Sequence, residues 1–507
     1  MLLRFFILSL FIGFYPGLYA QGLDFGKLNS YVGKAVNEHK ITGLTIGIVK
    51  SGETIYQHGY GYCTNGETKR VNTTTNYGIA SLSKAFTAAA MGMLVDEGKV
   101  NWDDHVITHL PDWKLYDDEV TKKMTIADLL THRCGLKTFD GDLLWYGSNY
   151  SRKEIITRIR QLPLSYEYRN GFGYQNIMYI TAGEVIAKVS GQSWDKFIRD
   201  RIFKPLGMNK SNTSISEYKE NDNVAMPHLK GVPQKLINYD NSGATAAINS
   251  NVVDMNKWMM FLLNDGTHDG VRLMKKETLD MLWSMQNPLP VSTFDSTNGT
   301  TYKGYGMGWF LMDYQNKKIV HHGGGLPGYI TKVFLVPEDS IGVVILTNDM
   351  SPVCTALMYK ILDMLYGDPD KTDWSKKFAE YSAKSDKMDE AKKFAQDTSR
   401  KVDTKPGAEL EAFAGAYSDP YYGNANIILV GKGKKARLVL SLAPAKALFT
   451  TKSMEHWQDN SFVFEFNDAF LPRGFANFEL EGGLVKGFTI DLENPDFHFS
   501  NLKFTKN

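Results

Sequence analysis

The sequence predicts an α+β domain, in which an antiparallel sheet is flanked by helices, followed by a C-terminal all-β domain that is barrel-like. Three observations favour this architecture. Strand-like runs occur near residue 50 and again between residues 318 and 347, and helical runs lie between them. From about residue 408 the chain alternates apolar and polar residues over short runs. The chain has 507 residues, which exceeds the size of one ordinary domain.

The strands of the first domain are expected at both of its ends. Residues 44–62 predict a hairpin, because two β-rich runs flank a Ser51-Gly52 turn. Three later β-rich runs lie at residues 318–321, 329–336 and 341–347. A turn sequence at 337–340 joins the last two, which should therefore be antiparallel. We expect one sheet that is closed by the two ends of a mixed domain.

Helices are expected between these strands. Residues 81–97 are rich in Ala, Met and Leu and predict a long helix. Residues 176–190 have apolar side chains at helical spacing, and residues 125–132 predict a short helix. Asn251 is expected to cap another helix, with Asp254 at its third position.

The C-terminal domain is expected to be a small barrel of about 100 residues. Its alternating runs are NIILV, RLVLSL, SFVFEF, FANFEL, VKGFTIDL and FHFSNLKF. A charged stretch before it predicts a solvated helical connector. The expected boundaries are a signal peptide at 1–20, the first domain at 21–367, the connector at 368–407 and the all-β domain at 408–507.

The first twenty residues predict a signal peptide. Met1–Arg4 form a short basic segment, and Phe5–Tyr15 form an apolar run that is too short to span a bilayer. Ala20 supplies a small residue before the cleavage site, and an uncleaved signal anchor is the alternative. No later segment is apolar enough to span a membrane. We therefore expect an exported protein, periplasmic or secreted, without an integral membrane segment after signal removal.

Charge and cysteine content narrow the expected partners. The formal net charge is +1, so neither nucleic acid nor an anionic surface is favoured. Cys63, Cys134 and Cys354 have the spacing of neither a metal knuckle nor a redox pair. We expect buried thiols without a catalytic role and leave open whether two of them pair. No metal or organic cofactor is expected.

Ser81-Leu82-Ser83-Lys84 is the first of three motifs that carry chemistry, and it opens the helix expected at 81–97. Residues three apart lie on one helical face, so the Ser81 and Lys84 side chains can meet. A serine hydroxyl becomes a nucleophile when a base takes its proton, and burial lowers the pKa of a lysine. Alone, the motif also fits an N-cap serine and a surface lysine.

Tyr174-Gln175-Asn176 is the second motif and follows a glycine-rich run. A tyrosine hydroxyl can shuttle a proton when a nearby ammonium lowers its pKa. An asparagine amide can orient a substrate carbonyl and hold a lysine by a hydrogen bond. A loop tyrosine and a helix-cap asparagine are the alternative interpretation.

The third motif, HHGGGLPG, runs from His321 to Gly328. Successive glycines let a backbone approach a ligand closely, and a strand edge there could pair with an extended substrate and donate an N–H to an oxyanion. A flexible hairpin with an incidental histidine pair is the alternative. A metal site is disfavoured, because adjacent histidines on a strand point to opposite faces and no carboxylate cluster accompanies them.

The three motifs occur in one order, at separations of about 90 and 150 residues. Together they resemble the serine β-lactamase and penicillin-binding-protein superfamily, whose nucleophile lies in an S-x-x-K motif. Y-x-N, and histidine in the third motif, resemble the class C β-lactamase branch, which includes D-aminopeptidases, D-Ala-D-Ala carboxypeptidases and esterases. The resemblance covers roughly residues 25–365 and includes TIADLLTHRCGL. The C-terminal domain resembles the lipocalin-like domain appended to some members.

The resemblance implies a role for each matching residue. Ser81 would be the acylated nucleophile, and Lys84 and Tyr174 would share the general-base and general-acid work in an order that is left open. The substrate-binding residues that it implies are Asn176, His322 and Gly324. The oxyanion hole that it implies consists of the backbone N–H groups of Ser81 and Gly325.

Two positions depart from the family pattern. Cys134 stands where the family often has serine, and a structural role is expected for it. His322 replaces the lysine that helps to bind the substrate carboxylate in class C β-lactamases. This replacement argues against strong β-lactamase activity.

The sequence therefore predicts an exported serine hydrolase that acts through a Ser81 acyl-enzyme on peptides, with D-amino acids expected, or on β-lactams. A carboxylesterase and a non-catalytic sensor of muropeptides or β-lactams are the alternatives. The expected partner is a small peptide, ester or β-lactam, and the oligomeric state is open. Specificity is assigned to loops at 140–150 and 288–303. The C-terminal domain is expected to shape the active-site mouth, with ligand binding of its own as the alternative.

Overall fold

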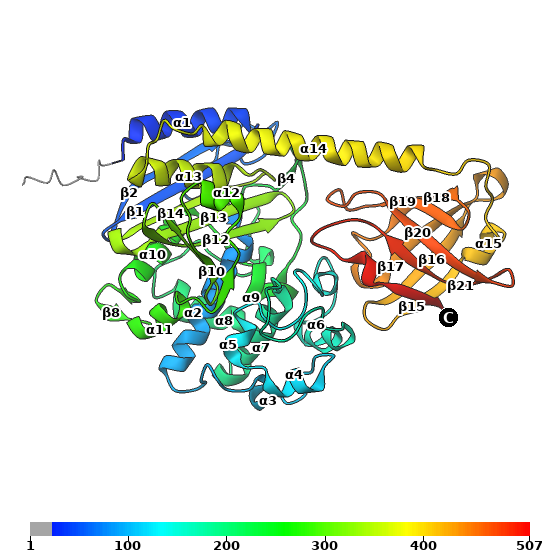
Figure 1. Cartoon of the computed structure of the whole chain (residues 1–507), viewed down its shortest axis with the longest axis horizontal. Coiled ribbons are helices and arrows are strands. Elements are labelled where there is room, and N and C mark those ends of the chain that lie inside the picture. The colour runs from blue at the N-terminus through cyan, green and yellow to red at the C-terminus, as the bar shows by residue number, and fades with distance from the viewer. Residues whose placement is uncertain (1–22) are drawn as a thin grey trace, which may run out of the picture.

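The computed structural model describes residues 23–507, and the expected signal peptide at 1–20 lies outside them. Two domains are joined by one long helix, as Figure 1 shows. An eight-stranded sheet in the order β2-β1-β14-β13-β12-β11-β10-β9 forms the centre of the first domain. A closed barrel of eight strands forms the second. The predicted fold class is confirmed.

The two ends of the first domain pair with each other near one edge of its antiparallel sheet. β1 (Gly43–Lys50) pairs with β2 (Glu53–Gly61) on one side and with β14 (Ile341–Thr347) on the other. β13 (Tyr329–Val336) lies between β14 and β12 (Lys317–Leu326). The predicted hairpin and the predicted closure of the sheet are therefore confirmed. The remaining strands of this sheet are β11 (Phe310–Tyr314), β10 (Lys303–Tyr305) and β9 (Asn287–Leu289).

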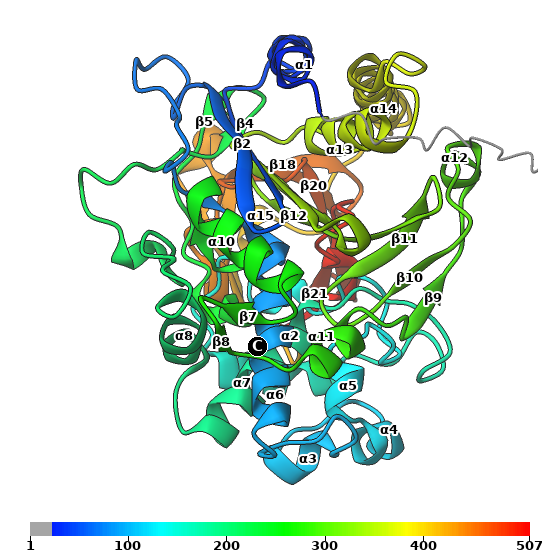
Figure 2. The same ribbon diagram turned by 90° about the vertical axis from the view of Figure 1, so that its left-hand side faces the viewer.

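Helices cover both faces of this sheet, as Figure 2 shows. α1 (Phe25–Glu38) and α13 (Val353–Tyr366) share one apolar core with the sheet. α10 (Val252–Leu263) packs on the opposite face, where Gly47 of β1 leaves room for it. β1 is thus buried on both faces from Gly43 to Val49.

α2 (Ser83–Asp96) runs through the helical layer and is buried on nearly all sides. Its apolar residues therefore form no single stripe. The helix begins two residues later than predicted, because η1 (Ala80–Leu82) forms a tight 3-10 turn before it. α7 (Asn176–Ser190) follows the prediction and ends at Gly191, whose φ is 71°.

Shorter helices complete the first domain. They are α3 (Val106–His109), α4 (Asp118–Lys123), α5 (Ile126–Leu129), α6 (Arg152–Arg158), α8 (Trp194–Ile198), α9 (Gly243–Ala246), α11 (Lys276–Leu282) and α12 (Thr293–Thr297). Three two-stranded ribbons pair β3 (Tyr77–Gly78) with β6 (Asn249–Ser250), β4 (His228–Leu229) with β5 (Val232–Pro233), and β7 (Thr267–His268) with β8 (Val271–Arg272).

The predicted cap of α10 is confirmed, since Asn251 Oδ1 accepts the N–H of Asp254 at 3.1 Å.

α14 (Trp374–Thr398) reaches from the first domain to the barrel, as Figure 1 shows. Trp374 Nε1 donates to Asp363 Oδ2 at 2.6 Å and fixes the start of the helix. Near its end, Asp397 Oδ1 accepts from Arg473 Nη1 of the barrel at 2.6 Å. Within residues 23–507, no helix combines the length and the apolar character needed to cross a membrane.

Each barrel strand pairs with the next along the chain, and the last closes on the first, which is the up-and-down order of lipocalins. The strands are β15 (Gly415–Asp419), β16 (Gly423–Val430), β17 (Arg437–Leu442), β18 (Thr451–Gln458), β19 (Ser461–Phe466), β20 (Gly474–Glu481), β21 (Leu484–Asp491) and β22 (Lys503–Lys506), and a short helix, α15 (Leu410–Phe413), precedes them. Inside, the rings of Phe413, Phe462, Phe478 and Phe488 pack with centroids 4.9 to 5.6 Å apart. This packed interior favours the shaping role over ligand binding inside the barrel.

The prediction from sequence omits two barrel strands and gives a third the wrong position. β15 is short and β18 is largely polar, so neither shows a clear alternation. The run at 497–504 predicts a strand, but only its end belongs to β22. Phe497 is buried against Trp145 and Tyr146 of the first domain, whereas Phe499 packs on Phe449 and Phe466 of the barrel, so their alternation does not come from a sheet.

Direct contacts fasten the barrel to the first domain. Tyr146 Oη donates to Asp468 Oδ2 at 2.8 Å, and the Phe497 ring stacks on that tyrosine with centroids 4.1 Å apart. His498 Nδ1 lies 2.9 Å from Asp140 Oδ1. The barrel is therefore held against the loop at 140–150 to which the sequence assigns specificity.

The three cysteines are buried free thiols, so the pairing that the sequence left open does not occur. Burial raises the pKa of Cys134 and of Cys354 to about 12. Both thiols are therefore protonated and poor nucleophiles.

We expect Gly487→Ala to destabilise the barrel, because a Cβ there would lie 2.2 Å from the backbone oxygen of Phe504 in the closing strand. Such overpacking lowers the free energy of unfolding by about 1–3 kcal/mol. Gly33→Ala is the matched control, because nothing lies within 4 Å of a Cβ in that turn of α1 and alanine favours helices. Urea unfolding of both variants measures the difference, and equal stability would contradict the prediction.

Candidate active site

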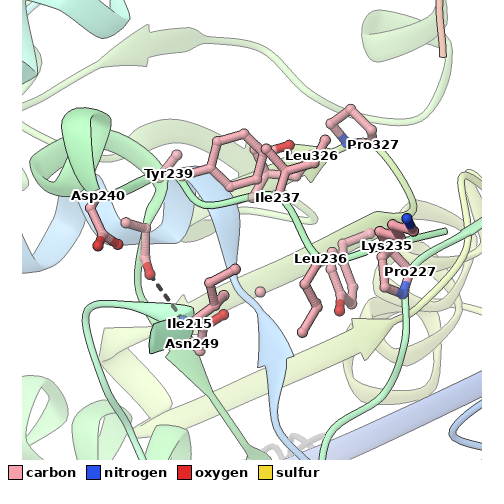
Figure 3. Close-up of a pocket in the computed structure, with 14 residues that line it drawn as sticks. Ile215, Pro227, Lys235, Leu236, Ile237, Tyr239, Asp240, Asn249, Leu326 and Pro327 are labelled. Atoms are coloured by element: carbon pink, nitrogen blue, oxygen red, sulfur yellow. Dashed lines mark hydrogen bonds between the residues drawn. The ribbon is translucent and has the colours of Figure 1, made fainter. Parts of the chain in front are cut away.

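The predicted site residues lie around a cavity of about 610 Å³ between the two domains. Its wall includes Ser81, Tyr174, Asn176, His322 and Gly325 from the first domain, and Phe470, Asp496 and Phe497 from the barrel. A cavity of about 20 Å³, shown in Figure 3, shares Ala246, Leu326 and Pro327 with it but includes none of the predicted site residues. The three sequence motifs are therefore brought together at the larger cavity.

Ser81 lies in η1, one turn before Lys84, and follows Ala80, whose φ of 53° is strained for a residue with a side chain. Lys84 is completely buried, and its Nζ lies 3.0 Å from Ser81 Oγ. The same Nζ donates to Asn176 Oδ1 at 2.6 Å and to Thr245 O at 3.2 Å. Burial lowers the pKa of Lys84 well below its ordinary value. A neutral amine would give its two N–H groups to those oxygens and keep its lone pair for the Ser81 O–H.

Asn176 is the first residue of α7 and links Lys84 to a buried carboxylate. Its Oδ1 accepts from Lys84 Nζ and also from Thr245 Oγ1, at 2.7 Å. Its Nδ2 donates to Asp142 Oδ2 at 2.6 Å. The amide is therefore held from both ends, which fixes its orientation beside the cavity.

Asp142 is a site residue that sequence reasoning missed, because one aspartate in a loop carries no recognisable pattern. Burial raises its pKa to about 8, while Trp145, Asn176 and Lys84 act to lower it and Asp496 adds to the increase. Its Oδ1 is buried, and the indole N–H of Trp145 is the neighbouring donor that lowers its pKa. Asp142 is therefore a carboxyl group poised between its two protonation states at the cavity wall.

Tyr174 presents its ring to Lys84, whose Nζ lies 4.8 Å from the ring centroid. Burial raises the pKa of Tyr174 well above its ordinary value, although its hydroxyl interacts with Ser81, which lowers it. The phenol is therefore protonated in the resting site.

His322 lines the cavity as a neutral imidazole. Its Nδ1–H donates to Gly323 O at 2.6 Å, so its Nε2 accepts from Tyr305 Oη at 3.3 Å. Burial, together with nearby Lys84, lowers the pKa of His322 to about 3. This imidazole thus supplies no positive charge, unlike the lysine that it replaces.

His132 is a second residue that the sequence did not assign to the site, although it lies in the segment THRCGL. Its Nδ1 accepts the backbone N–H of Gln175 at 2.9 Å, and its ring lies 4.2 Å from that of Tyr174 and 4.5 Å from that of Tyr305. Burial lowers its pKa well below the ordinary value. We infer that this neutral ring positions Tyr174.

Gly324 lies where β12 packs against η1. A Cβ at this position would lie 2.4 Å from the backbone oxygen of Ile79 and 3.1 Å from Ala80 Cβ. The cavity wall is formed by its neighbours Gly323 and Gly325. The structure thus gives Gly324 a packing role beside the nucleophile, whereas the resemblance implied substrate binding.

The cavity runs along one edge of β12. β11 pairs with β12 only as far as Phe310 and His321, and β13 pairs on the other side as far as Leu326. Beyond His321, the edge away from β13 is therefore available for an extended ligand to pair with.

Comparison with known proteins identifies this arrangement. Residues 28–361 match the model of the beta-lactamase family, and residues 399–506 match a domain of unknown function, DUF3471. The chain therefore belongs to the beta-lactamase family, a family of serine hydrolases. The barrel corresponds to the second match.

Sequence relatives include the unguisins hydrolase ungD' of Aspergillus campestris, which is 29% identical over 77% of this chain and 74% of its own length. Protein flp of Staphylococcus aureus is 28% identical over 61% of this chain and 60% of its own length.

Two solved structures share the fold. The octameric penicillin-binding protein homologue from Pyrococcus abyssi has a TM-score of 0.61 and 22% identity, and the match covers 96% of this chain and 100% of that one. The D-amino acid amidase from Ochrobactrum anthropi SV3 has a TM-score of 0.56 and 22% identity, covering 67% of this chain and 98% of the amidase.

We expect Gly324→Ala to lower the rate of ester hydrolysis about 100-fold, because a displacement of β12 by about 1 Å moves its edge away from Ser81. Gly323→Ala is the control on the same strand, since a Cβ there would meet no atom closer than 3.8 Å. Steady-state kinetics with a nitrophenyl ester, together with thermal unfolding, measure both variants. Equal activity of the two would show that the close approach at Gly324 does not matter.

Proposed function

We propose that the protein is an exported serine hydrolase that forms an acyl-enzyme at Ser81 and cleaves short peptides or amides containing D-amino acids. The observation that carries this proposal is the 3.0 Å contact between Ser81 Oγ and the buried Nζ of Lys84. A neutral amine beside a serine hydroxyl is a base that can activate it. Export is proposed from the signal-peptide pattern at residues 1–20.

In the acylation step, Ser81 Oγ attacks the carbonyl carbon and its proton passes to Lys84 Nζ. Lys84 suits this role because burial lowers its pKa. Tyr174 is less suited, because burial raises its pKa and keeps its hydroxyl protonated. The ammonium that forms on Lys84 would be stabilised by Asn176 Oδ1 and by the nearby Asp142 carboxylate.

The tetrahedral oxyanion would lie against the backbone N–H groups of Ser81 and Gly325, and losing one such donor typically costs about 2.7–4 kcal/mol of barrier. Tyr174 would donate its proton to the leaving group and recover one from Lys84. A water molecule then attacks the acyl-enzyme and gives its proton to Lys84. The proton returns to Ser81 as the product leaves.

Two observations support amide and peptide substrates over β-lactams. His322 is neutral, because its pKa is lowered to about 3, so it offers no charge to the carboxylate of a penicillin. The name of one similar protein, a D-amino acid amidase, supports amide cleavage, and the name of another, an unguisins hydrolase, supports a hydrolytic reaction. β-Lactams are therefore proposed to acylate Ser81 without rapid turnover.

A carboxylesterase of the class C branch is the second candidate. The aromatic side chains that line the cavity, including Phe139, Phe172 and Phe310, would suit an apolar acyl group. Comparing the rate of hydrolysis of short acyl esters with that of D-amino acid amides distinguishes the esterase from the amidase activity.

We expect Ser81→Ala to reduce turnover of every substrate that the parent accepts by at least about 10⁴-fold, since it removes the nucleophile. Mass spectrometry after treatment with a fluorophosphonate should find one adduct on Ser81 in the parent and none in the variant. A Ser81→Ala variant that keeps the parental rates would contradict the assignment of Ser81 as the nucleophile. A parent that forms a stable adduct but turns over no amide, peptide or ester would instead be a sensor.

If Lys84 is the base, its protonation determines the acid side of the pH profile of kcat/KM. kcat/KM should rise with pH as Lys84 loses its proton, at a pH well below the ordinary lysine pKa of 10.5. Asp142→Asn should move this limb to lower pH, because the Asp142 charge favours the protonated lysine. Profiles of parent and variant test this, and a limb near pH 10.5, or one that the variant leaves in place, would contradict it.

A further inference from the structure

We propose that Lys332 of β13 forms an anion subsite on the face of the sheet opposite Ser81, where it binds an acidic side chain in the leaving portion of the substrate. This inference rests on the proposed hydrolase function and names its substrate class. It makes the protein selective for peptides in which the residue directly after the scissile bond carries a side-chain carboxylate.

The two faces of β12 present different residues to the cavity. Gly323 of β12 pairs with Lys332 of β13. Residues directly opposite each other in a sheet point to the same face, and successive residues of a strand alternate between faces. Gly324 packs against the turn that carries Ser81. Lys332 therefore points to the other face, which α13 covers.

The cavity reaches both faces because it follows the free edge of β12. Ser81 and His322 line it on one face, and Ile330 and Lys332 line it on the other. β11 pairs with β12 only as far as His321. An extended ligand that pairs with the edge beyond this residue would therefore place its side chains alternately on the two faces.

The Lys332 side chain lies across Gly323, the residue opposite it. A Cβ at Gly323 would lie 3.9 Å from Cδ and 3.9 Å from Nζ of Lys332. Because Gly323 has no side chain, none stands at this position between the ammonium group and the free edge of β12. The ammonium group is thus within reach of a ligand that lies along this edge.

The Lys332 ammonium group lacks a counter-ion of its own. Within residues 23–507 it forms no hydrogen bond or ion pair, and the titratable neighbours that affect its pKa are Cys354 and Lys303, neither of which is a carboxylate. Lys303 is already paired, with its Nζ 2.8 Å from Asp295 Oδ2. Burial, together with Lys303, lowers the pKa of Lys332 to about 8, so it is a cation at neutral pH. A bound carboxylate would compensate its charge.

His321 offers a second polar group on the same face, since it lies two residues before Gly323. Its ring stacks on that of Phe310 with centroids 5.7 Å apart, and its Nδ1 is buried without a partner among the described residues. Burial lowers the pKa of His321 well below its ordinary value, and Lys332 adds to the decrease. A neutral imidazole with its proton on Nδ1 can donate to the carboxylate that Lys332 binds.

The position of Lys332 along β12 selects the leaving portion of the substrate. In the proposed mechanism the oxyanion lies at Gly325, and Tyr174 protonates the leaving group. The Tyr174 ring lies beside that of His322, with centroids 6.1 Å apart, so the leaving portion extends from Gly325 toward that histidine. It passes the level of Lys332 on the way. The main chain of the ligand would follow the edge of β12, so it is a side chain that turns to the face of Lys332.

The test compares two peptides of the same shape, D-alanyl-D-glutamate α-amide and D-alanyl-D-glutamine α-amide, which differ in the charge on the leaving residue. We expect the parent to prefer the glutamate peptide by about 10- to 100-fold in kcat/KM, mainly through KM. Lys332→Met should remove this preference and leave the rate on the glutamine peptide unchanged. Lys50→Met is the matched control and should keep it, because Lys50 is an exposed lysine at the end of β1 in the same sheet.

Equal parental rates on the two peptides would overturn the inference, and so would an equal loss on both in Lys332→Met, which would show that the lysine only supports the sheet. A loss confined to D-alanyl-D-alanine with a free carboxyl group would overturn it as well, because Lys332 would then bind the main-chain carboxylate. A parent that takes a fluorophosphonate on Ser81 but cleaves neither peptide would also overturn it, while the hydrolase function stands. If Ser81 takes no label and neither peptide is cleaved, the proposed function itself fails.

Discussion

The active site depends on one amine that is kept away from water. An ammonium buried in a protein costs several kcal/mol unless its surroundings compensate, so the complete burial of Lys84 favours its neutral form. The residues around Lys84 can accommodate both its neutral amine form and its ammonium form. Asn176 and Thr245 accept its N–H groups, and the rings of Tyr174 and Tyr179 lie 4.8 and 5.5 Å from its nitrogen, where they exclude water and attract an ammonium.

The rest of the fold holds this amine in a fixed place. α2 is enclosed by other elements, so the helix that carries Lys84 has little freedom to shift. β12 presses against the turn that carries Ser81, and Gly324 is the residue that permits this approach. The sheet and the helical layer thus each contribute one side of the reacting centre.

Much of this could be predicted from sequence because the signals are local. The hairpin at 44–62, the helix at 176–190 and the motifs at Ser81 and Tyr174 each depend on residues near one another in the chain. Asp142, Thr245 and His132 could not be assigned, because each becomes part of the site only through contacts with distant residues. The run at 497–504 misled for the same reason: its alternating phenylalanines are buried partly against another domain.

The contact between the barrel and the cavity has a consequence for how this enzyme could diversify. The groups around Lys84 lie in the first domain, whereas one wall of the cavity comes from a loop near the end of the chain. In the proposed hydrolase, the groups that cleave the bond thus belong to one domain, and part of the wall that meets the substrate belongs to the other. In the proposed hydrolase, changes at 494–498 would reshape this wall while the groups around Lys84 keep their positions, and the barrel would act as an exchangeable lining for a constant reaction centre.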